Sequence, residues 1–243
     1  MTTTENITTD QLSLHASRAK ITSDSHQILA NNWSDTSSIC DWLGVSCGSR
    51  HHRVTALNIS NLGLTGTIPP ELGNLSFLVS LDMSGNNIHG KLPHDLANLR
   101  RLRVLDFTVN NLSGEFPSWL SSLEKLQYLA MGNNSLTCFI PPSISNMSKL
   151  ETLKLSFNVI QGKVPIEMGN LNKLKTLNLM YNQLSGSLPF EIFNISSLEW
   201  LSLTSMIPST ICQCSKVRLL GLAYNNFSGS VPEEFARGST SWQ

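Results

Sequence analysis

One leucine position recurs at a fixed interval along most of this sequence. Its copies lie 24 residues apart, and they are Leu57, Leu81, Leu105, Leu129, Leu153, Leu177 and Leu201. A fixed interval of this kind indicates a repeat architecture in which each repeat is one structural unit. Around each leucine, inward and outward positions alternate, which predicts a short strand with one buried face. Such a strand cannot bury its apolar face alone, so the copies are expected to stack into a parallel sheet with a continuous core.

An asparagine and a proline recur with the same interval as far as Asn182 and Pro189, and each occurs once more beyond it. The asparagines are Asn86, Asn110, Asn134, Asn158, Asn182 and Asn225, and the prolines are Pro69, Pro93, Pro117, Pro141, Pro165, Pro189 and Pro232. The asparagine amide can satisfy backbone groups where the chain turns off the strand, so we expect a ladder of asparagines between coils. A glycine before the proline permits a bend with positive φ, and the proline then ends strand pairing.

These positions together resemble the plant-specific leucine-rich-repeat family, whose repeat reads LxxLxLxxNxLxGxIPxxLxxLxx. The resemblance runs from about Asp10 to Phe235. It implies an α/β repeat solenoid, a right-handed superhelix with a concave parallel β-sheet and a small helical N-terminal cap. It also implies a second short sheet following the Gly-x-Ile-Pro turn. We assign residues 54–236 to the solenoid, as eight coils of which the seventh is shortened.

Residues 10–53 are expected to cover the first core layer, which a solenoid otherwise exposes, and residues 1–9 are predicted to be disordered. Thr9 or Asp10 is a suitable N-cap for a short helix that runs to about Ile21. The inward residues of this helix are expected to be Leu12, Ala16 and Ala19.

The cap also contains Cys40 and Cys47 with Trp33 and Trp42. This pattern resembles the paired-cysteine cap of plant receptor-like kinases. The subfamily it matches contains the receptors for bacterial flagellin and elongation factor and the rice bacterial-blight resistance receptor. The resemblance implies a disulfide between the two cysteines, with the tryptophans sealing the first repeat. Two incidental free thiols are the alternative.

The repeat is broken near its C-terminal end. Leu220 follows Leu201 by 19 residues, so the seventh coil lacks its asparagine and glycine. We expect low hydrogen-exchange protection from Leu201 to Phe235, because the loss stays local in a nearest-neighbour stack. Residues 237–243 resemble no cap, and neither a signal peptide nor a kinase motif is visible. We interpret the chain as a fragment of a receptor or a gene model cut across an exon.

Three further cysteines bring the total to an odd count of five. Cys138 replaces a turn glycine, Cys212 falls on the convex side and Cys214 falls on a core position. Cys212 and Cys214 have no matching pair of metal-binding residues nearby in the sequence, so no metal site is predicted, and the role of the three cysteines stays open.

Composition and motifs argue against catalysis and against a charged partner. Charged residues make up 14% of the chain, and 17 basic residues balance 17 acidic ones, so we expect no basic face for nucleic acid or anionic lipid. No apolar run approaches the roughly 18 residues of a membrane span. The histidines form no catalytic constellation, and no phosphate-binding glycine loop occurs. We predict no enzyme activity, no cofactor and no membrane insertion by this chain itself.

The sequence contains nine Asn-x-Ser/Thr sites for N-glycosylation. They are Asn6, Asn32, Asn58, Asn74, Asn111, Asn133, Asn146, Asn194 and Asn226. Some arise from the repeat itself. Together with the paired cysteines, they favour an extracellular or cell-surface location, as part of a plasma-membrane receptor.

The leading hypothesis is a ligand-recognition ectodomain, or a fragment of one, of a plant receptor-like serine/threonine kinase in innate immunity or development. Its partners would be a peptide or protein ligand and a co-receptor with a related ectodomain. The alternatives are a secreted inhibitor of a microbial enzyme, similar to polygalacturonase inhibitors, and a truncated gene remnant.

The ligand is predicted to use the concave face of the later coils, because aromatic and basic anchors dominate binding energy. The predicted residues are Tyr128, Lys154, Phe157, Tyr181, Trp200 and Tyr224. Earlier coils present mostly small or aliphatic groups, such as Ser80, Ser84, Gly85 and Val109.

Overall fold

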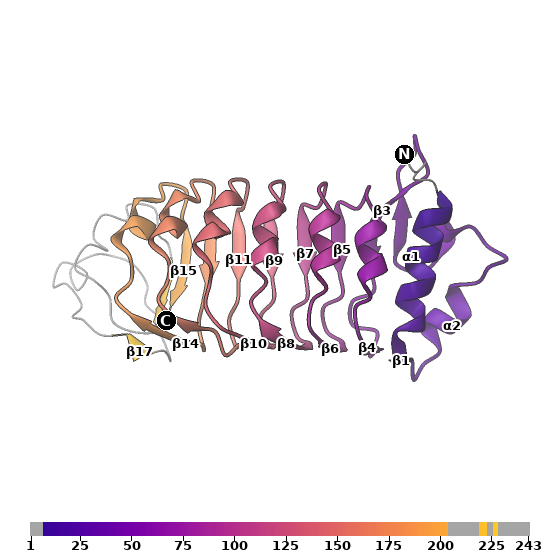
Figure 1. The fold of residues 1–243 in the computed structure, drawn as a ribbon, viewed down its shortest axis with the longest axis horizontal. Coiled ribbons are helices and arrows are strands. Elements are labelled where there is room, and N and C mark those ends of the chain that lie inside the picture. Colours follow the sequence, from indigo (N-terminus) through magenta and orange to yellow (C-terminus); the bar gives the residue numbers. More distant parts are fainter. Residues whose placement is uncertain (1–6, 204–218, 223–225, 228–243) are drawn as a thin grey trace.

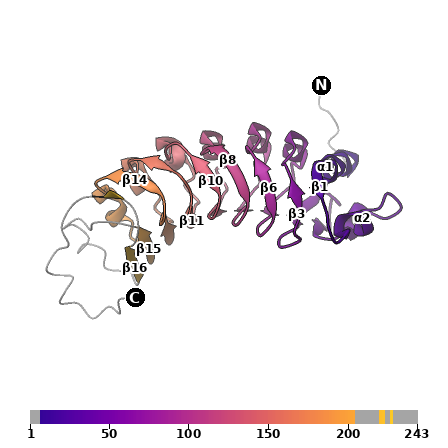
Figure 2. The same cartoon turned by 90° about the horizontal axis from the view of Figure 1, so that it is seen from below.

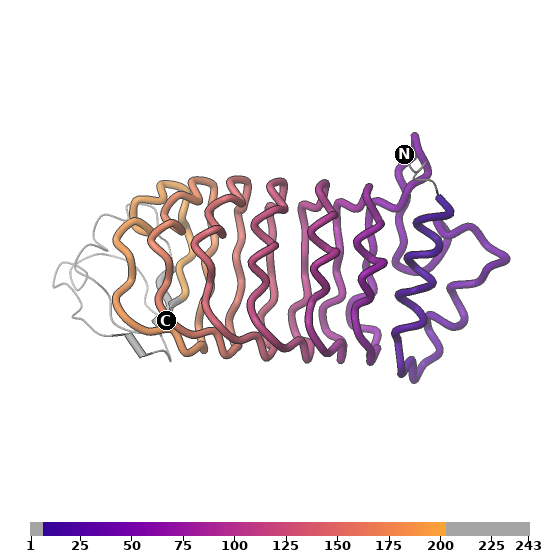
Figure 3. Tube along the Cα trace, viewed as in Figure 1, coloured from indigo at the N-terminus to yellow at the C-terminus, as the bar shows by residue number. Residues whose placement is uncertain are grey.

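The chain forms a curved stack of coils with a helical cap at its N-terminal end (Figure 1). The structure, a computed structural model, describes residues 7–203, 219–222 and 226–227. The chain trace in Figure 3 makes one turn per coil. Strands line the inside of the curve, and 3₁₀-helices lie on its outside (Figure 2). The predicted solenoid with a concave parallel sheet and a helical cap is confirmed.

The concave sheet has nine strands in the order β16-β15-β13-β11-β9-β7-β5-β3-β2. They are β2 (Val45–Cys47), β3 (Val54–Asn58), β5 (Ser80–Asp82), β7 (Val104–Asp106), β9 (Tyr128–Ala130), β11 (Thr152–Lys154), β13 (Thr176–Asn178), β15 (Trp200–Leu203) and β16 (Leu219–Leu222). Strand β2 comes from the cap and runs antiparallel to β3, whereas the eight solenoid strands are parallel. The repeated leucines lie in register, as Leu57 does against Leu81, and they are buried.

A second set of short strands lies along the edge of the coils that is lowest in Figure 1. They are β1 (Ile21–Ser23), β4 (Thr65–Gly66), β6 (Asn87–Gly90), β8 (Asn111–Glu115), β10 (Ser135–Thr137), β12 (Gln161–Gly162), β14 (Gln183–Gly186) and β17 (Asn226–Phe227). The expectation that this sheet follows the Gly-x-Ile-Pro turn is wrong, since β6 ends at Gly90 and Pro93 comes later. Pairing must end before the proline, which has no N–H to donate.

The second set divides into two sheets, with orders β1-β4-β6-β8-β10 and β12-β14-β17. The division falls after β10, where Cys138 occupies the position of the turn glycine with φ 64°. Glycines of neighbouring coils have the same left-handed backbone, as Gly162 does at φ 78°. Cys138 therefore accepts a conformation that an ordinary side chain rarely adopts.

Short 3₁₀-helices cover the convex side and follow the prolines. They are η2 (Pro70–Asn74), η3 (His94–Asn98), η4 (Ser118–Ser122), η5 (Pro142–Asn146), η6 (Ile166–Asn170) and η7 (Phe190–Asn194), and the cap contains a further one, η1 (Ile39–Asp41). Each solenoid 3₁₀-helix begins directly after a proline with extended backbone, as η3 does after Pro93. One leucine or its equivalent in each of these helices points into the core, as Leu96 does in η3.

The cap helix differs from its prediction in bounds and in orientation. Helix α1 (Ile7–Ala19) begins inside the segment predicted to be disordered, and β1 takes over at Ile21. Leu12 is 64% exposed and Ala19 is exposed, whereas the buried residues include Asp10. The other buried residues of α1 are Ser13, Leu14 and Ser17. The predicted inward face was therefore wrong.

Hydrogen bonds explain why polar residues occupy the inward face of α1. The Asp10 carboxylate accepts from Nε and Nη2 of Arg53 at 2.9 and 2.7 Å and from the backbone N of Val54 at 2.8 Å. The hydroxyls of Ser13 and Ser17 each donate to the carbonyl four residues earlier, at 2.9 Å. Asp10 is thus a buried anchor rather than an N-cap.

Two tryptophans fill the space between the cap and the first coil. Trp33 and Trp42 are buried and stacked, with ring centroids 5.3 Å apart. Their indole N–H groups donate to carbonyls of the cap, from Trp33 to Leu43 at 2.9 Å and from Trp42 to Ser34 at 3.0 Å. Cys40 and Cys47, which flank Trp42, are joined by a disulfide. Helix α2 (Ile28–Asn32) completes the cap.

The concave sheet continues past the irregular seventh coil. Strand β15 pairs in parallel with β16, with Leu201 opposite Leu220. The 19-residue step therefore joins two equivalent strand positions. The residues between them, which include Cys212 and Cys214, and the predicted tail 237–243 lie outside the described residues. Most of the segment from Leu201 to Phe235, for which low hydrogen-exchange protection is predicted, also lies outside them.

Candidate functional site

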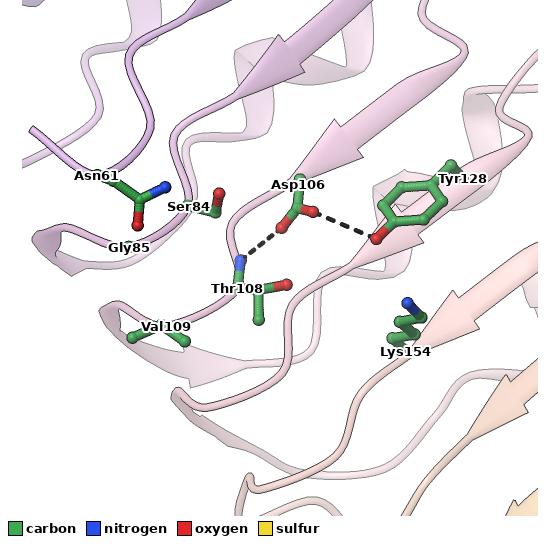
Figure 4. A pocket seen from close by; sticks show the side chains of 8 residues that line it. All are labelled: Asn61, Ser84, Gly85, Asp106, Thr108, Val109, Tyr128 and Lys154. Atoms are coloured by element: carbon green, nitrogen blue, oxygen red, sulfur yellow. Dashed lines mark hydrogen bonds between the residues drawn. The ribbon is translucent and has the colours of Figure 1, made fainter.

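The concave face displays two outward positions on each strand, one on either side of the buried leucine. Because the strands are in register, equivalent residues form rows that run along the stack. One such row contains Asp106 on β7, Ala130 on β9 and Lys154 on β11. Here the concave face has an open hollow of about 330 Å³ (Figure 4). Its lining residues are Asn61, Ser84, Gly85, Asp106, Thr108, Val109, Tyr128 and Lys154.

The carboxylate of Asp106 is held in place from two sides. Its Oδ1 accepts from the backbone N of Thr108 at 2.8 Å, and its Oδ2 accepts from the Tyr128 hydroxyl at 3.3 Å (Figure 4). One coil earlier, Oδ1 of Asp82 accepts from the backbone N and the hydroxyl of Ser84, at 3.0 and 2.7 Å. Both carboxylates are only half-buried, so they retain free acceptor capacity towards the concave side.

Burial, followed by the charge and hydrogen bond of Asp106 and the charge of Asp82, raises the pKa of Tyr128 to about 12. Tyr128 therefore remains a neutral phenol at physiological pH, with its proton directed at Asp106. The Lys154 ammonium lies 5.6 Å from the centroid of the Tyr128 ring, within the range of a cation–π contact. The hollow thus presents a carboxylate, a phenol and an ammonium group from three adjacent strands.

The structure brings Tyr128 and Lys154 together in the hollow, whose lining does not include Phe157, Tyr181 or Trp200. Phe157 is 46% exposed and stacks on Tyr181, with ring centroids 4.1 Å apart and planes 11° from parallel. Both lie on the turns after their strands, with φ of 56° and 54°. Trp200 is 48% exposed on β15, and Tyr224 lies outside the described residues.

Residues closer to the cap complete the hollow, and the sequence prediction did not include them. Asp106 lines the hollow from an outward strand position, and Asp82 occupies the equivalent position one coil earlier, outside the lining. Each is followed two residues later by Ser84 or Thr108. An aspartate with a serine or threonine two residues later favours a local hydrogen-bonded turn. This pattern is visible in the sequence and could have identified both aspartates. Ser84, Gly85 and Val109 line the hollow although they are small or aliphatic, since small side chains leave the space that the hollow occupies.

Seven of the nine potential glycosylation sites have exposed asparagine side chains. They are Asn32, Asn58, Asn74, Asn111, Asn133, Asn146 and Asn194. Asn6 and the side chain of Asn226 lie outside the described residues.

The described part of the chain contains no group of three His, Cys, Asp or Glu residues placed to hold a metal ion. None of the helices described here has the length and apolar character needed to cross a bilayer.

Comparison with protein families assigns both parts of the structure. The leucine rich repeat N-terminal domain family matches residues 7–48, and leucine rich repeat families match residues 53–75, 77–99, 102–160 and 173–195. These matches cover most of the chain, which belongs to the leucine-rich-repeat proteins.

Its curated relatives include plant receptor kinases. The LRR receptor-like serine/threonine-protein kinase EFR of Arabidopsis thaliana is 37% identical over 75 residues, which is 31% of this chain and 7% of the kinase. The receptor kinase-like protein Xa21 of Oryza sativa subsp. japonica is 38% identical over 87 residues, which is 34% of this chain and 8% of that protein. The matched segments therefore span less than a tenth of either relative.

A solved receptor structure shares the fold over nearly the whole chain. The crystal structure of PEPR1–AtPEP1 superimposes with a TM-score of 0.82 and 29% identity, and covers 93% of this chain and 36% of that chain. The cap, the concave sheet and the convex 3₁₀-helices thus form the same fold as that solved structure.

Proposed function

We propose that this chain is a ligand-recognition part of the ectodomain of a plant receptor-like kinase, that it is displayed at the cell surface, and that it binds a peptide on its concave face. The similarity to EFR and Xa21 supports the receptor class. The structure of the Arabidopsis receptor kinase HAESA ectodomain in complex with an IDA peptide hormone ligand supports a peptide as the ligand, because an ectodomain of similar fold holds one. The disulfide of the cap and the seven exposed glycosylation sites support passage through the secretory pathway.

The row that contains Asp106 and Lys154 carries the proposal. These opposite charges lie two strands apart at the same register, which corresponds to about 10 Å. An extended peptide advances about 3.3 Å per residue, so three residues span that distance. A peptide that crosses the strands can place a cationic group at Asp106 and a carboxylate at Lys154. Tyr128 lies between the two charges and can accept a hydrogen bond from the peptide backbone.

The test is a selection of random peptides displayed on phage, with the purified chain as bait. Enriched peptides, made synthetically, are expected to carry a basic and an acidic residue three positions apart. Calorimetry should show binding weakened about tenfold or more by Asp106→Asn, since a charge-assisted hydrogen bond is lost. Lys154→Gln should lower the binding affinity of peptides that carry the acidic residue.

Asp95→Asn is the matched control, because it removes the same charge from an exposed position on the convex helix η3. Its affinity for the selected peptides should equal that of the unchanged chain. If no peptide is enriched, or if both aspartate variants bind alike, the concave hollow is not the recognition site.

A further inference from the structure

Basic residues form a row along one edge of the solenoid, away from the concave hollow. The edge consists of the turns that join each 3₁₀-helix to the next strand, which are uppermost in Figure 1. At one position in these turns, four consecutive coils carry Arg101, Lys125, Lys149 and Lys173. Successive members are 24 residues apart, so each coil contributes one positive charge to this row. Arg100, Arg103 and Lys175 lie beside the row in the same turns.

Backbone hydrogen bonds fix the spacing of this row. Two residues after the basic position, a backbone N–H of each coil donates to a carbonyl of the preceding coil. Gln127 donates to Arg103, Glu151 to Gln127 and Lys175 to Glu151, each at 2.8 Å. Adjacent strands joined in this way lie about 4.8 Å apart. The four charges therefore stand in single file over roughly 15 Å.

The side chains that carry these charges are exposed and make few interactions within the described part of the protein. Lys125, Lys149 and Lys173 make no ion pair or hydrogen bond with any described residue, whereas Lys175 pairs with Glu151 at 2.7 Å. At the start of the row, the Arg101 guanidinium lies 3.9 Å from the centroid of the Phe77 ring. The lysines are thus available to an external partner.

Opposite charges are concentrated elsewhere on the described surface. Asp82 and Asp106 lie on the concave strands, and Glu71, Asp95, Glu167 and Glu191 lie on the convex 3₁₀-helices. Within the four turns themselves, the acidic residues are Glu124 and Glu151, and Glu151 is paired with Lys175. Equal numbers of acidic and basic residues in the whole sequence are therefore compatible with a local row of cations at this edge. A net charge of zero says nothing about where the charges lie.

We propose that this edge binds a linear polyuronate, a polysaccharide that carries one carboxylate on each sugar. Its charges recur once per sugar ring, and a ring is about as long as the spacing between adjacent coils. A single file of cations fits a line of charge, whereas a bilayer would engage cations spread over a face. The four turns contain no exposed aromatic ring on which bases could stack, which favours a polysaccharide over single-stranded nucleic acid.

The probe is fully de-esterified oligogalacturonate, measured by affinity electrophoresis at low ionic strength with the intact chain. Binding is expected, with an affinity that falls as salt rises, because neutralised carboxylates release counterions. The variant Lys149→Gln/Lys173→Gln should bind roughly tenfold more weakly and show a shallower salt dependence.

The matched control is Lys91→Gln/Lys163→Gln, which removes two exposed lysines that follow β6 and β12 on the opposite edge. It should bind as the unchanged chain does, and circular dichroism should show both variants folded. Equal binding by the two variants would overturn the proposal, as would equal binding of the methyl-esterified polymer. Tighter binding of single-stranded DNA or of anionic vesicles would assign the edge to those partners instead.

Discussion

At the scale of the residue, one asparagine in each of five consecutive coils connects that coil to the one before it. The Nδ2 of Asn158 donates to the carbonyl of Met131 in the preceding coil at 2.9 Å and to that of Leu155 in its own coil at 3.1 Å. Its Oδ1 accepts from the backbone N of Leu136 at 2.9 Å. Asn158 is 8% exposed, so water cannot replace these bonds. The predicted asparagine ladder is confirmed for Asn86, Asn110, Asn134, Asn158 and Asn182, whereas Asn225 lies outside the described residues.

Asn158→Ala should lower the free energy of unfolding by about 1–3 kcal/mol for each buried group left without a partner. Asn178→Ala is the control, since Oδ1 of that half-buried residue accepts from the backbone N of Met180 at 3.1 Å within one coil. Urea unfolding of both variants, followed by circular dichroism, measures the difference. Equal destabilisation would show that the bonds between coils contribute little.

At the scale of the element, the cap helix shows where a sequence pattern stops being informative. Its apolar residues predicted an inward face, but Leu12 is exposed and Asp10 is buried. The reason lies 43 residues away along the chain, where Arg53 pairs with Asp10. A periodicity argument within one segment cannot detect such a partner. The strands were predictable because the same local rule recurs in every coil.

Asp10→Ala should lower the free energy of unfolding by about 3–5 kcal/mol, because it removes the carboxylate that neutralises the buried charge of Arg53. Arg53 is 4% exposed. The double variant Asp10→Ala/Arg53→Met should recover much of the loss, since it removes both charges. Asp41→Ala, at an exposed position in η1, serves as the control. A mild effect of Asp10→Ala, or no recovery in the double variant, would contradict the pair's anchoring role.

At the scale of the whole molecule, the 24-residue interval was enough to predict the solenoid. The position and lining of the hollow could be identified only from the structure. Tyr128 and Lys154 were predicted from their chemistry, but Asn61, Asp106 and Thr108 contribute to the hollow because the curved sheet brings several coils together. Outward residues vary freely within the repeat, so no interval identifies which of them line one surface. The separation of Phe157 and Trp200 from the hollow has the same cause.

Because each coil contacts mainly its neighbours, whole coils should be removable. Deleting residues 159–182 joins Asn158 to Gln183 and removes one interval of 24 residues, leaving the lining of the hollow intact. We expect a folded, shorter chain that retains affinity for concave-face peptides. Deleting residues 159–170 removes half an interval and should prevent folding. Circular dichroism and thermal unfolding compare the two, and equal behaviour would contradict the repeat as the unit of stability.

The asparagine ladder also has a direction. Asn86, Asn110, Asn134 and Asn158 each bond to backbone groups of the preceding coil as well as to their own. During synthesis, which releases the N-terminal end first, a coil therefore acquires these bonds only when the next asparagine has left the ribosome. The most recently synthesised coil of a nascent chain therefore always lacks the hydrogen bonds from the next coil's asparagine. A pause in translation would leave that coil without these hydrogen bonds, whereas all earlier coils would already have formed theirs.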